Sequence, residues 1–507
     1  MNKLKQELNV SVSSTPVDSV HSRNGADQAL DLVDGAYEPD VLEEKNVLKK
    51  IDFHILPWLC SMYFCQYLDK QALSYAAIMG ILEDCNLQGR DYAWTSSIYY
   101  AAYLVAAYPH NRLMQQFPEC KYVAFFGVLW GMTLMCMAAC NSFASLMVVR
   151  ALMGVFEAPT TGGLVLITSK WYKSNEQSSR TGFWFASVGV ASMLGSILAF
   201  SAYRGELQTH VKMHSWKILC LGIGAFTICW GILMFIFMDN SIITARFLNR
   251  EEKRVAIERL RTNNQGIGTK VFKWPQFWEA ILDYRTWMYF CLMATSQIPV
   301  AGIQSFASQM LKSYGWGVDV SLLLQTLPSG FLQIISSLGF GYIGSRYKNK
   351  SLACFGAMIV SLFGMALMIG LQDVSSLYKK SGQLVAYIIL VGNSATPFAV
   401  ICAMASSNVA GHTKKTTTNG LLFLSMAFAY FIGPQVFDDG PYYHKAKVVS
   451  LTLWAVCLIL CILNVALNKW ENTNRDKFIE KNNIEKVENS EFMDLTDKKN
   501  PYFRYSY

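Results

Sequence analysis

The stretch KILCLGIGAFTICWGILMFIFM, residues 217–238, carries no charged side chain after Lys217 and is otherwise almost entirely apolar. An α-helix rises ~1.5 Å per residue, so about 20 such residues cross the ~30 Å hydrocarbon core of a bilayer. Stretches of this kind recur from about Phe53 to Leu467. The sequence therefore predicts an all-α membrane protein. We expect twelve transmembrane helices, with approximate bounds 53–75, 92–111, 121–140, 145–169, 181–203, 217–238, 287–310, 320–343, 351–371, 382–407, 417–437 and 447–468.

The overall composition agrees with that prediction. Of the 507 residues, 52% are apolar and only 16% are charged, whereas about a quarter of a soluble chain is charged. The formal charge of +8 does not indicate nucleic-acid binding, because the basic residues lie between the apolar blocks rather than on one soluble face. The 13 cysteines fall mostly inside those blocks and lack metal-ligand spacing, so we expect no metal and no cofactor.

A polar segment at residues 239–286 divides the apolar blocks into two sets of similar length. It contains ARFLNREEKRVAIERLR (residues 245–261), a helix-forming amphipathic stretch. Two six-helix halves joined by a loop are the architecture of many transporters that are built from internal repeats. The expected domains are an N-terminal tail, a six-helix bundle, a central loop, a second six-helix bundle and a C-terminal tail, at residues 1–45, 46–238, 239–286, 287–468 and 469–507.

The distribution of Lys and Arg predicts the orientation in the membrane. The central loop is strongly basic, and the even-numbered connections between helices hold slightly more Lys and Arg than the odd-numbered ones. We therefore expect the central loop and both tails to face the cytosol. The first 45 residues contain no apolar run, so we expect no cleavable signal peptide and assign targeting to the first membrane helix.

Four ionisable residues lie inside the predicted helices, where a charge is unfavourable and usually functional. They are Asp69 and Lys70 in the first helix, and Arg150 and Glu157 in the fourth. Seven residues separate Arg150 from Glu157, almost two helical turns, so the two share one face. Asp69 lies ~24 Å above the cytosolic start of its helix at 1.5 Å per residue. Arg150 lies about five residues below the outer end of its own helix, so we expect Asp69, Lys70 and Arg150 at similar depth and Glu157 nearer the midplane. Opposite charges at one depth can pair across a central cavity.

Two interpretations of these charges are open. They are either ion pairs that fix helix packing, or a site for an anion and protons. Buried pairs are poor stabilisers in general, because desolvation offsets most of the attraction. We favour the second interpretation, in which Lys70 and Arg150 attract an anionic substrate while Asp69 and Glu157 take up and release protons.

Other polar and aromatic residues within the helices are weaker signals. We assign Asn393 to substrate hydrogen bonding, with hydrogen bonding between helices as an equal alternative. The same two interpretations apply to Gln297, Gln304, Gln325, Gln333 and Asn408. Trp94, Tyr99 and Tyr100 are candidates for the mouth of the cavity.

Several segments together resemble the fungal allantoate permease family, which belongs to the anion:cation symporters of the major facilitator superfamily. They are YLDKQALSYAAIMGI (67–81), VVRALMGVFEAPTTGG (148–163), ARFLNREEKRVAIERLR (245–261), FKWPQFWEAILDYRTW (272–287), SSNVAGHTKK (406–415), IGPQVF (432–437) and MDLTDKKNPYFRYSY (493–507). The resemblance implies proton-coupled uptake of a small organic anion, such as allantoate, ureidosuccinate, nicotinate, pantothenate, biotin or cysteine. It also implies that Asp69, Lys70, Arg150 and Glu157 are the coupling residues.

The sequence departs from the superfamily pattern in several places. The loop PHNRLMQQFPECKY (109–122) lacks the usual Gly, Asp and basic cluster. Its counterpart in the second half keeps Gly341 and Arg346, for which the resemblance implies a gate, but has Ser345 where an acid is common. Tyr430 stands where many relatives have Asn before the IGP sequence, and we expect it to contact substrate.

The sequence thus predicts a monomeric, proton-coupled symporter for a small organic anion in the plasma membrane. An uncoupled facilitator or exporter is the main alternative, and an internal membrane such as the endoplasmic reticulum is the alternative location. A nutrient sensor on a transporter scaffold is disfavoured because such sensors often carry a long cytosolic tail, and the tails here are short. An enzyme is disfavoured because we find no metal motif, nucleophile elbow or phosphate loop.

Overall fold

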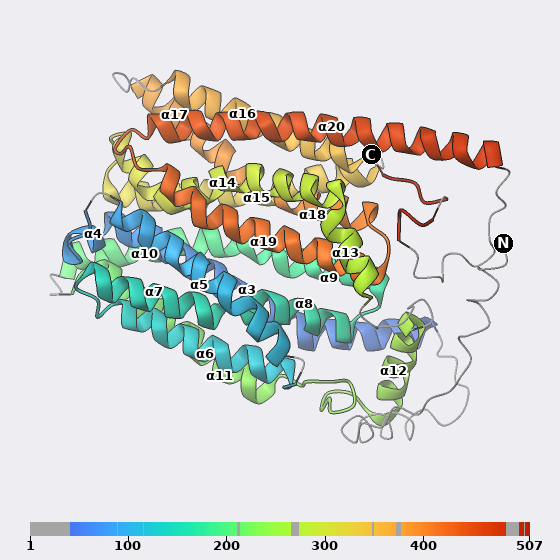
Figure 1. The fold of residues 1–507 in the computed structure, drawn as a ribbon. Coiled ribbons are helices and arrows are strands. Elements are labelled where there is room, and N and C mark those ends of the chain that lie inside the picture. The colour runs from blue at the N-terminus through green and yellow to red at the C-terminus, as the bar shows by residue number, and fades with distance from the viewer. Residues whose placement is uncertain are drawn as a thin grey trace.

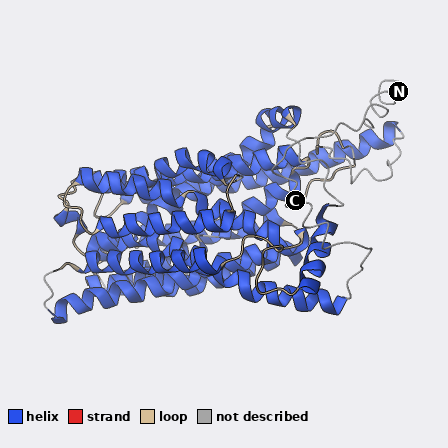
Figure 2. Cartoon of the chain, turned by 90° about the horizontal axis from the view of Figure 1, so that it is seen from below, coloured by secondary structure: helices blue, strands red, loops and turns tan. Residues whose placement is uncertain are grey.

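The computed structural model describes residues 41–88, 90–114, 116–209, 213–264, 273–346, 349–371, 377–394, 396–482, 496–500 and 502–506. Within these ranges the chain is helical and contains no strand (Figure 2). Most of the expected N-terminal tail (residues 1–40) and residues 483–495 of the expected C-terminal tail lie outside the described residues.

In the described part of the chain, twelve long rods lie side by side in one bundle (Figure 1). Nine are single helices: α3 (Val41–Ile78), α5 (Asp91–Leu113), α6 (Glu119–Met137), α11 (Ser215–Phe237), α14 (Tyr284–Ser313), α15 (Val318–Arg346), α16 (Lys350–Gly370), α19 (His412–Val436) and α20 (His444–Asn482). Three consist of two consecutive helices: α7 (Phe143–Glu157) with α8 (Pro159–Trp171), α9 (Ser174–Phe185) with α10 (Ser187–Thr209), and α17 (Leu377–Asn393) with α18 (Thr396–Asn408). The shorter helices are α4 (Ile81–Asp84), α12 (Arg250–Asn264) and α13 (Trp274–Leu282).

The rods correspond one to one with the twelve predicted spans, but several are longer. α3 begins by Val41 and α20 continues to Asn482, well beyond the expected spans 53–75 and 447–468. A helix continues wherever its backbone hydrogen bonds are kept, in water as well as in lipid, whereas hydropathy marks only the apolar part of it.

Three rods are too polar to be recognised as membrane spans by hydropathy. Among the described residues, nine rods are long and apolar enough to cross a membrane, and α3, α5 and α14 are not among them. α3 packs against α14, and α5 packs against α19, so these rods lie where the two halves of the bundle meet. Polar side chains on such rods are buried against protein rather than exposed to lipid, as a charge inside a membrane requires.

The most extensive contacts between the two halves join three pairs of rods: α3 with α14, α5 with α19, and α10 with α15. The third contact depends on small residues. A Cβ atom added to Gly330 of α15 would lie 3.0 Å from the carbonyl oxygen of Gly189 in α10. The absence of both side chains therefore lets the two helix backbones approach closely.

The bundle has two distinct ends (Figure 1). We call the end with α12, α13 and the C-terminal residues the central-loop end, and the end with α4 the far end. Hydrogen bonds and ion pairs that join described residues of the two halves run from the middle of the bundle to the far end. Tyr92 donates to the Ser305 carbonyl at 2.7 Å, and Arg204 lies 2.8 Å from Asp319. The far end is therefore closed.

The described residues near the C-terminus fold back onto the central-loop end of the second half. We call residues 496–500 and 502–506 the C-terminal strap. Asp497 lies 2.7 Å from Lys414 at the start of α19. Asn408 and Ser506 exchange two hydrogen bonds, at 3.1 and 2.7 Å. Sequence reasoning did not predict these contacts, because the partners are distant in the chain and leave no local pattern.

Candidate functional site

Asp69 lies on α3 and is completely buried. Its Oδ2 atom accepts a hydrogen bond of 2.6 Å from the indole Nε1 of Trp130 on α6. Its Oδ1 atom has no hydrogen-bond partner among the described residues. A buried carboxylate oxygen without a donor is unfavourable, so this position suits a group that gains a proton or meets a bound water.

Glu157 is the last residue of α7, and it is also completely buried. The helix restarts at Pro159, whose missing amide hydrogen interrupts the backbone hydrogen bonding. The Oε1 atom of Glu157 lies 3.1 Å from Nζ of Lys70 and accepts a hydrogen bond of 2.9 Å from Gln66. Its Oε2 atom has no partner among the described residues. The acid–base pair that forms between the first and fourth rods is therefore Lys70 with Glu157.

Arg150 is a buried cation with only 4% of its surface exposed. Its Nε atom donates to the Thr95 carbonyl at 3.4 Å, and its guanidinium carbon lies 4.9 Å from the ring centroid of Tyr99. Among the described residues, no carboxylate lies within 4.0 Å of it. A cation that is held by a carbonyl oxygen and an aromatic face, with no carboxylate in ion-pair contact among the described residues, can accept an anionic partner.

A small cavity lies between the two halves beside these charges. Lys70 and Arg150 line it from the first half, and Gln304 and Ser305 of α14 line it from the second. Its volume is ≈ 20 Å³, which holds about one water molecule. The structure is therefore contracted around the site, and a substrate can enter only when the halves separate.

The other two residues predicted to bind substrate, Tyr430 and Asn393, do not line this cavity. Tyr430 lies behind the cavity, where its hydroxyl donates to Gln304 at 3.3 Å and its ring packs 4.8 Å from that of Tyr100, a lining residue. Asn393 is not part of the lining. Its amide donates to the Ala357 carbonyl at 2.7 Å, so it belongs to the packing of the second half.

The two predicted gate residues lie in the second half, at the end of the bundle opposite the far-end contacts. Arg346 is the last residue of α15 and is exposed, and Gly341 lies five residues before it on the same helix. Both are near the central-loop end and remote from the cavity between Lys70 and Arg150. A gating role for them stays a prediction.

Sequence reasoning did not single out two residues that hold the carboxylates. Gln66 is four residues before Lys70 on α3, so helical spacing places both on one face and would have indicated that they share a partner. Trp130 had no such signal, because it reaches Asp69 from a different helix.

A twelve-rod bundle of two halves, with buried charges beside a cavity between them, is the architecture of many membrane transporters. Residues 59–434 match the model of the Major Facilitator Superfamily. The chain is 33% identical to the allantoate permease of Saccharomyces cerevisiae, over 98% of this chain and 95% of that protein. It is 34% identical to the thiamine pathway transporter of the same yeast, over 98% and 96%. A bacterial homolog of the human lysosomal transporter Spinster has the same fold, with a TM-score of 0.62, 12% identity, and coverage of 81% of this chain and 96% of that one.

The chain belongs to the Major Facilitator Superfamily, and it is a multi-pass membrane transporter rather than an enzyme. The predictions of twelve transmembrane helices in two halves and of a resemblance to allantoate permease are confirmed.

Proposed function

We propose that this transporter is a proton-coupled symporter that imports a small organic anion. Lys70 and Arg150 bind the carboxylate of the substrate, and Asp69 and Glu157 carry the protons. The observation that supports this most is the state of Arg150, which is buried beside the cavity with no carboxylate within 4.0 Å among the described residues. The similarity to allantoate permease supports a small organic anion as substrate.

The coupling follows from competition for Lys70. In the contracted structure, Glu157 forms an ion pair with Lys70 at 3.1 Å, while no carboxylate of the described residues lies within 4.0 Å of Arg150. A substrate carboxylate that binds between Arg150 and Lys70 draws Lys70 away from Glu157. Glu157 then lies buried without a cation, and uptake of a proton removes that unfavourable charge. Substrate and proton therefore favour each other.

The membrane potential makes such coupling necessary for accumulation. A monoanion that enters a cell with a negative interior is opposed by ~2.3 kcal/mol per 100 mV. One proton makes the step electrically neutral, and a second makes it favourable. Two buried carboxylates, each with one oxygen atom lacking a partner among the described residues, are able to carry either number.

We place the central-loop end in the cytosol and the protein, as a monomer, in the plasma membrane. The basic central loop supports that orientation. The closed far end then corresponds to a transporter that has shut its outer side around the site. Substrate and protons load when the far end opens, and they leave toward the central-loop end after the halves rock.

The deciding experiment measures substrate-induced proton influx in vesicles that contain the purified protein. We expect acidification of the lumen with at least one member of a panel of allantoate, ureidosuccinate and nicotinate, and none with Arg150→Gln. Arg250→Gln, an exposed arginine on the central loop, is the matched control and should behave like the wild type. Accumulation without any proton movement would instead establish an uncoupled facilitator.

A further inference from the structure

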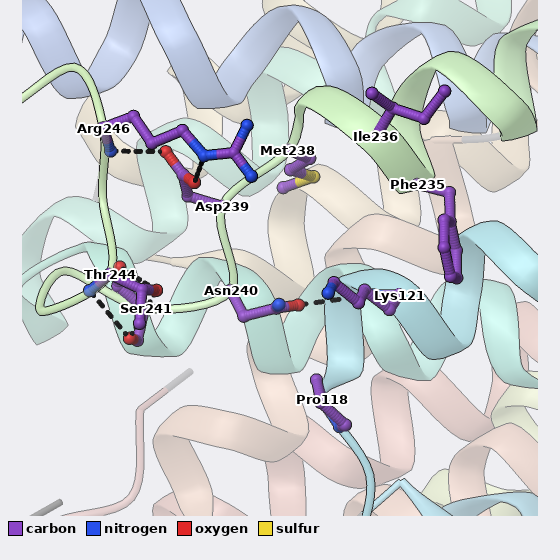
Figure 3. A pocket seen from close by; sticks show the side chains of 10 residues that line it. All are labelled: Pro118, Lys121, Phe235, Ile236, Met238, Asp239, Asn240, Ser241, Thr244 and Arg246. Atoms are coloured by element: carbon purple, nitrogen blue, oxygen red, sulfur yellow. Dashed lines mark hydrogen bonds and ion pairs between the residues drawn. The ribbon is translucent and has the colours of Figure 1, made fainter.

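A second cavity lies at the central-loop end of the first half, between the start of α6 and the end of α11 (Figure 3). Its volume is ≈ 360 Å³, which is within the range of small-molecule sites. It shares no lining residue with the central cavity. A single inorganic phosphate would leave much of this volume unfilled.

Two cations line this cavity. Lys121, the third residue of α6, lies with its ammonium 5.8 Å from the ring centroid of Phe235, and no carboxylate of the described residues lies within 4.0 Å of it. Arg246 has a side chain that is 78% exposed, and its Nε atom lies 3.7 Å from Asp239. Two cations against one carboxylate leave a net positive charge, which favours an anionic ligand.

One wall of the cavity is apolar and faces the lipid. Phe235 and Ile236 lie in the last turn of α11 and are 43% and 51% exposed. Large exposed apolar side chains at the end of a membrane helix are covered by acyl chains in the bilayer. Figure 3 shows Phe235 beside Lys121, with Arg246 and Asp239 grouped together away from them. The cavity therefore spans the boundary between the hydrocarbon and the headgroup region.

We propose that this cavity binds the headgroup of an anionic phospholipid from the adjacent leaflet. The phosphodiester lies between Lys121 and Arg246, and an acyl chain follows Phe235 and Ile236. The side-chain oxygen of Asn240 accepts a hydrogen bond of 3.4 Å from the backbone amide of Lys121. The side-chain amide hydrogens of Asn240 therefore remain available to the headgroup. Asp239 is only 10% exposed and is held by the Arg246 backbone amide at 2.8 Å, so it is fixed to receive the ammonium of a serine headgroup.

The bound lipid would also hold the start of the segment that connects the two halves. Arg246 precedes α12, which is tied to the first half by the ion pairs of Lys50 with Glu252 and of Arg259 with Glu176. The lipid adds an attachment ahead of that helix, next to Phe247, whose ring stacks on His54 and Trp171 of the first half. It fastens the connecting segment to the half that carries Lys70 and Arg150.

The test is native mass spectrometry of the purified full-length protein with phosphatidylserine, phosphatidylcholine or inorganic phosphate. We expect phosphatidylserine to be retained at one molecule per chain and phosphatidylcholine to be retained much less. Each of Lys121→Gln and Arg246→Gln should weaken retention about fivefold, and the double variant about 25-fold, since one surface cation near an anionic headgroup contributes about 1 kcal/mol.

The matched control is Lys469→Gln, which removes an exposed cation beside the exposed Trp470 of α20, outside any pocket described above. It should retain phosphatidylserine like the wild type. Equal retention in the double variant, equal retention of phosphatidylcholine, or displacement of the lipid by millimolar phosphate would each overturn the proposal. If the double variant does not fold, the same comparison with Lys121→Gln alone decides.

Discussion

The Nζ atom of Lys70 lies 3.1 Å from Oε1 of Glu157 and joins the first and fourth membrane rods at the centre of the bundle. The Lys70 side chain is 25% exposed and reaches the cavity between the halves, whereas Glu157 is completely buried behind it. Under the proposed function, a substrate anion therefore meets Lys70 first and acts on Glu157 through it.

Replacement of Arg150 by Ala should abolish most uptake. Arg150 is the cation beside the cavity that lacks a carboxylate within 4.0 Å among the described residues, so its loss removes the strongest contact to a substrate anion. We expect at least a tenfold loss of initial uptake rate with a normal amount of protein in the membrane, and a raised KM for Lys70→Ala. An unchanged substrate affinity in both variants would contradict the role of these cations.

Replacement of Glu157 by Gln should separate exchange from accumulation. The amide is neutral at all times, so it still permits substrate to bind but cannot cycle a proton. We expect loss of concentrative uptake while counterflow of labelled substrate continues. Wild-type uptake should rise as the external pH falls and stop with an uncoupler. Wild-type coupling in the Asp69→Asn/Glu157→Gln double variant would rule out proton transfer through these residues.

Replacement of Gly330 by Val should impair the contact between the halves. A Cβ atom at this position would lie 3.0 Å from the Gly189 carbonyl oxygen, and the backbone there cannot move aside. Overpacking of this kind destabilises by about 1–3 kcal/mol. We expect a lower melting temperature in detergent and reduced uptake. Gly339→Val is the control on the same helix, since a Cβ atom there meets nothing within 4 Å. Equal effects of the two substitutions would contradict this account.

Replacement of Asp497 by Asn should loosen the C-terminal strap. The Lys414 side chain is completely buried and lies 2.7 Å from both Asp283 and Asp497 and 3.1 Å from Glu279. Loss of one acid leaves that buried cation less compensated, so we expect a melting temperature several degrees below that of the wild type. The control is Asp476→Asn, whose exposed pair with Arg504 contributes little. A wild-type melting temperature for Asp497→Asn would show that the strap is not stabilising.

The same cluster predicts a pH dependence of stability. Burial raises the pKa of Asp283, but the hydrogen bond and charge of Lys414 outweigh burial, and the pKa is lowered below its ordinary value. Asp283 therefore contributes stability that is fully present above its unfolded pKa of about 3.9 and is lost as the pH falls through the folded pKa. Melting curves of the purified protein should lose this contribution only below about pH 4. Asp283→Asn should remove that part of the pH dependence.

Much of the fold was predictable, because membrane helices leave a local signal. Each predicted span coincides with a rod in the structure, and nine of the twelve rods are long and apolar enough among the described residues to cross a bilayer. The four central charges were also identifiable, since an ionisable residue inside such a run stands out without knowledge of its neighbours. The C-terminal strap was not identifiable from the sequence, because its contacts are with residues far away in the chain. Asp497 forms an ion pair with Lys414, and the backbone amide of Ser506 donates a hydrogen bond to Asn408.

The sequence by itself determined the number of membrane rods, their division into two halves and the positions of the buried charges along each rod. The number and division of the rods depend on the length of each apolar run, and the positions of the charges depend on helical spacing. Both are local properties of the sequence. Only the tertiary structure decided that Lys70 meets Glu157, that Trp130 holds Asp69, that Arg150 has no acid within 4.0 Å among the described residues, and that Asn393 packs away from the cavity. The physical reason is that a pair forms only when two helices present the right faces at the right depth. Rotation and depth are set by packing between side chains remote in sequence, such as the close approach of Gly189 and Gly330.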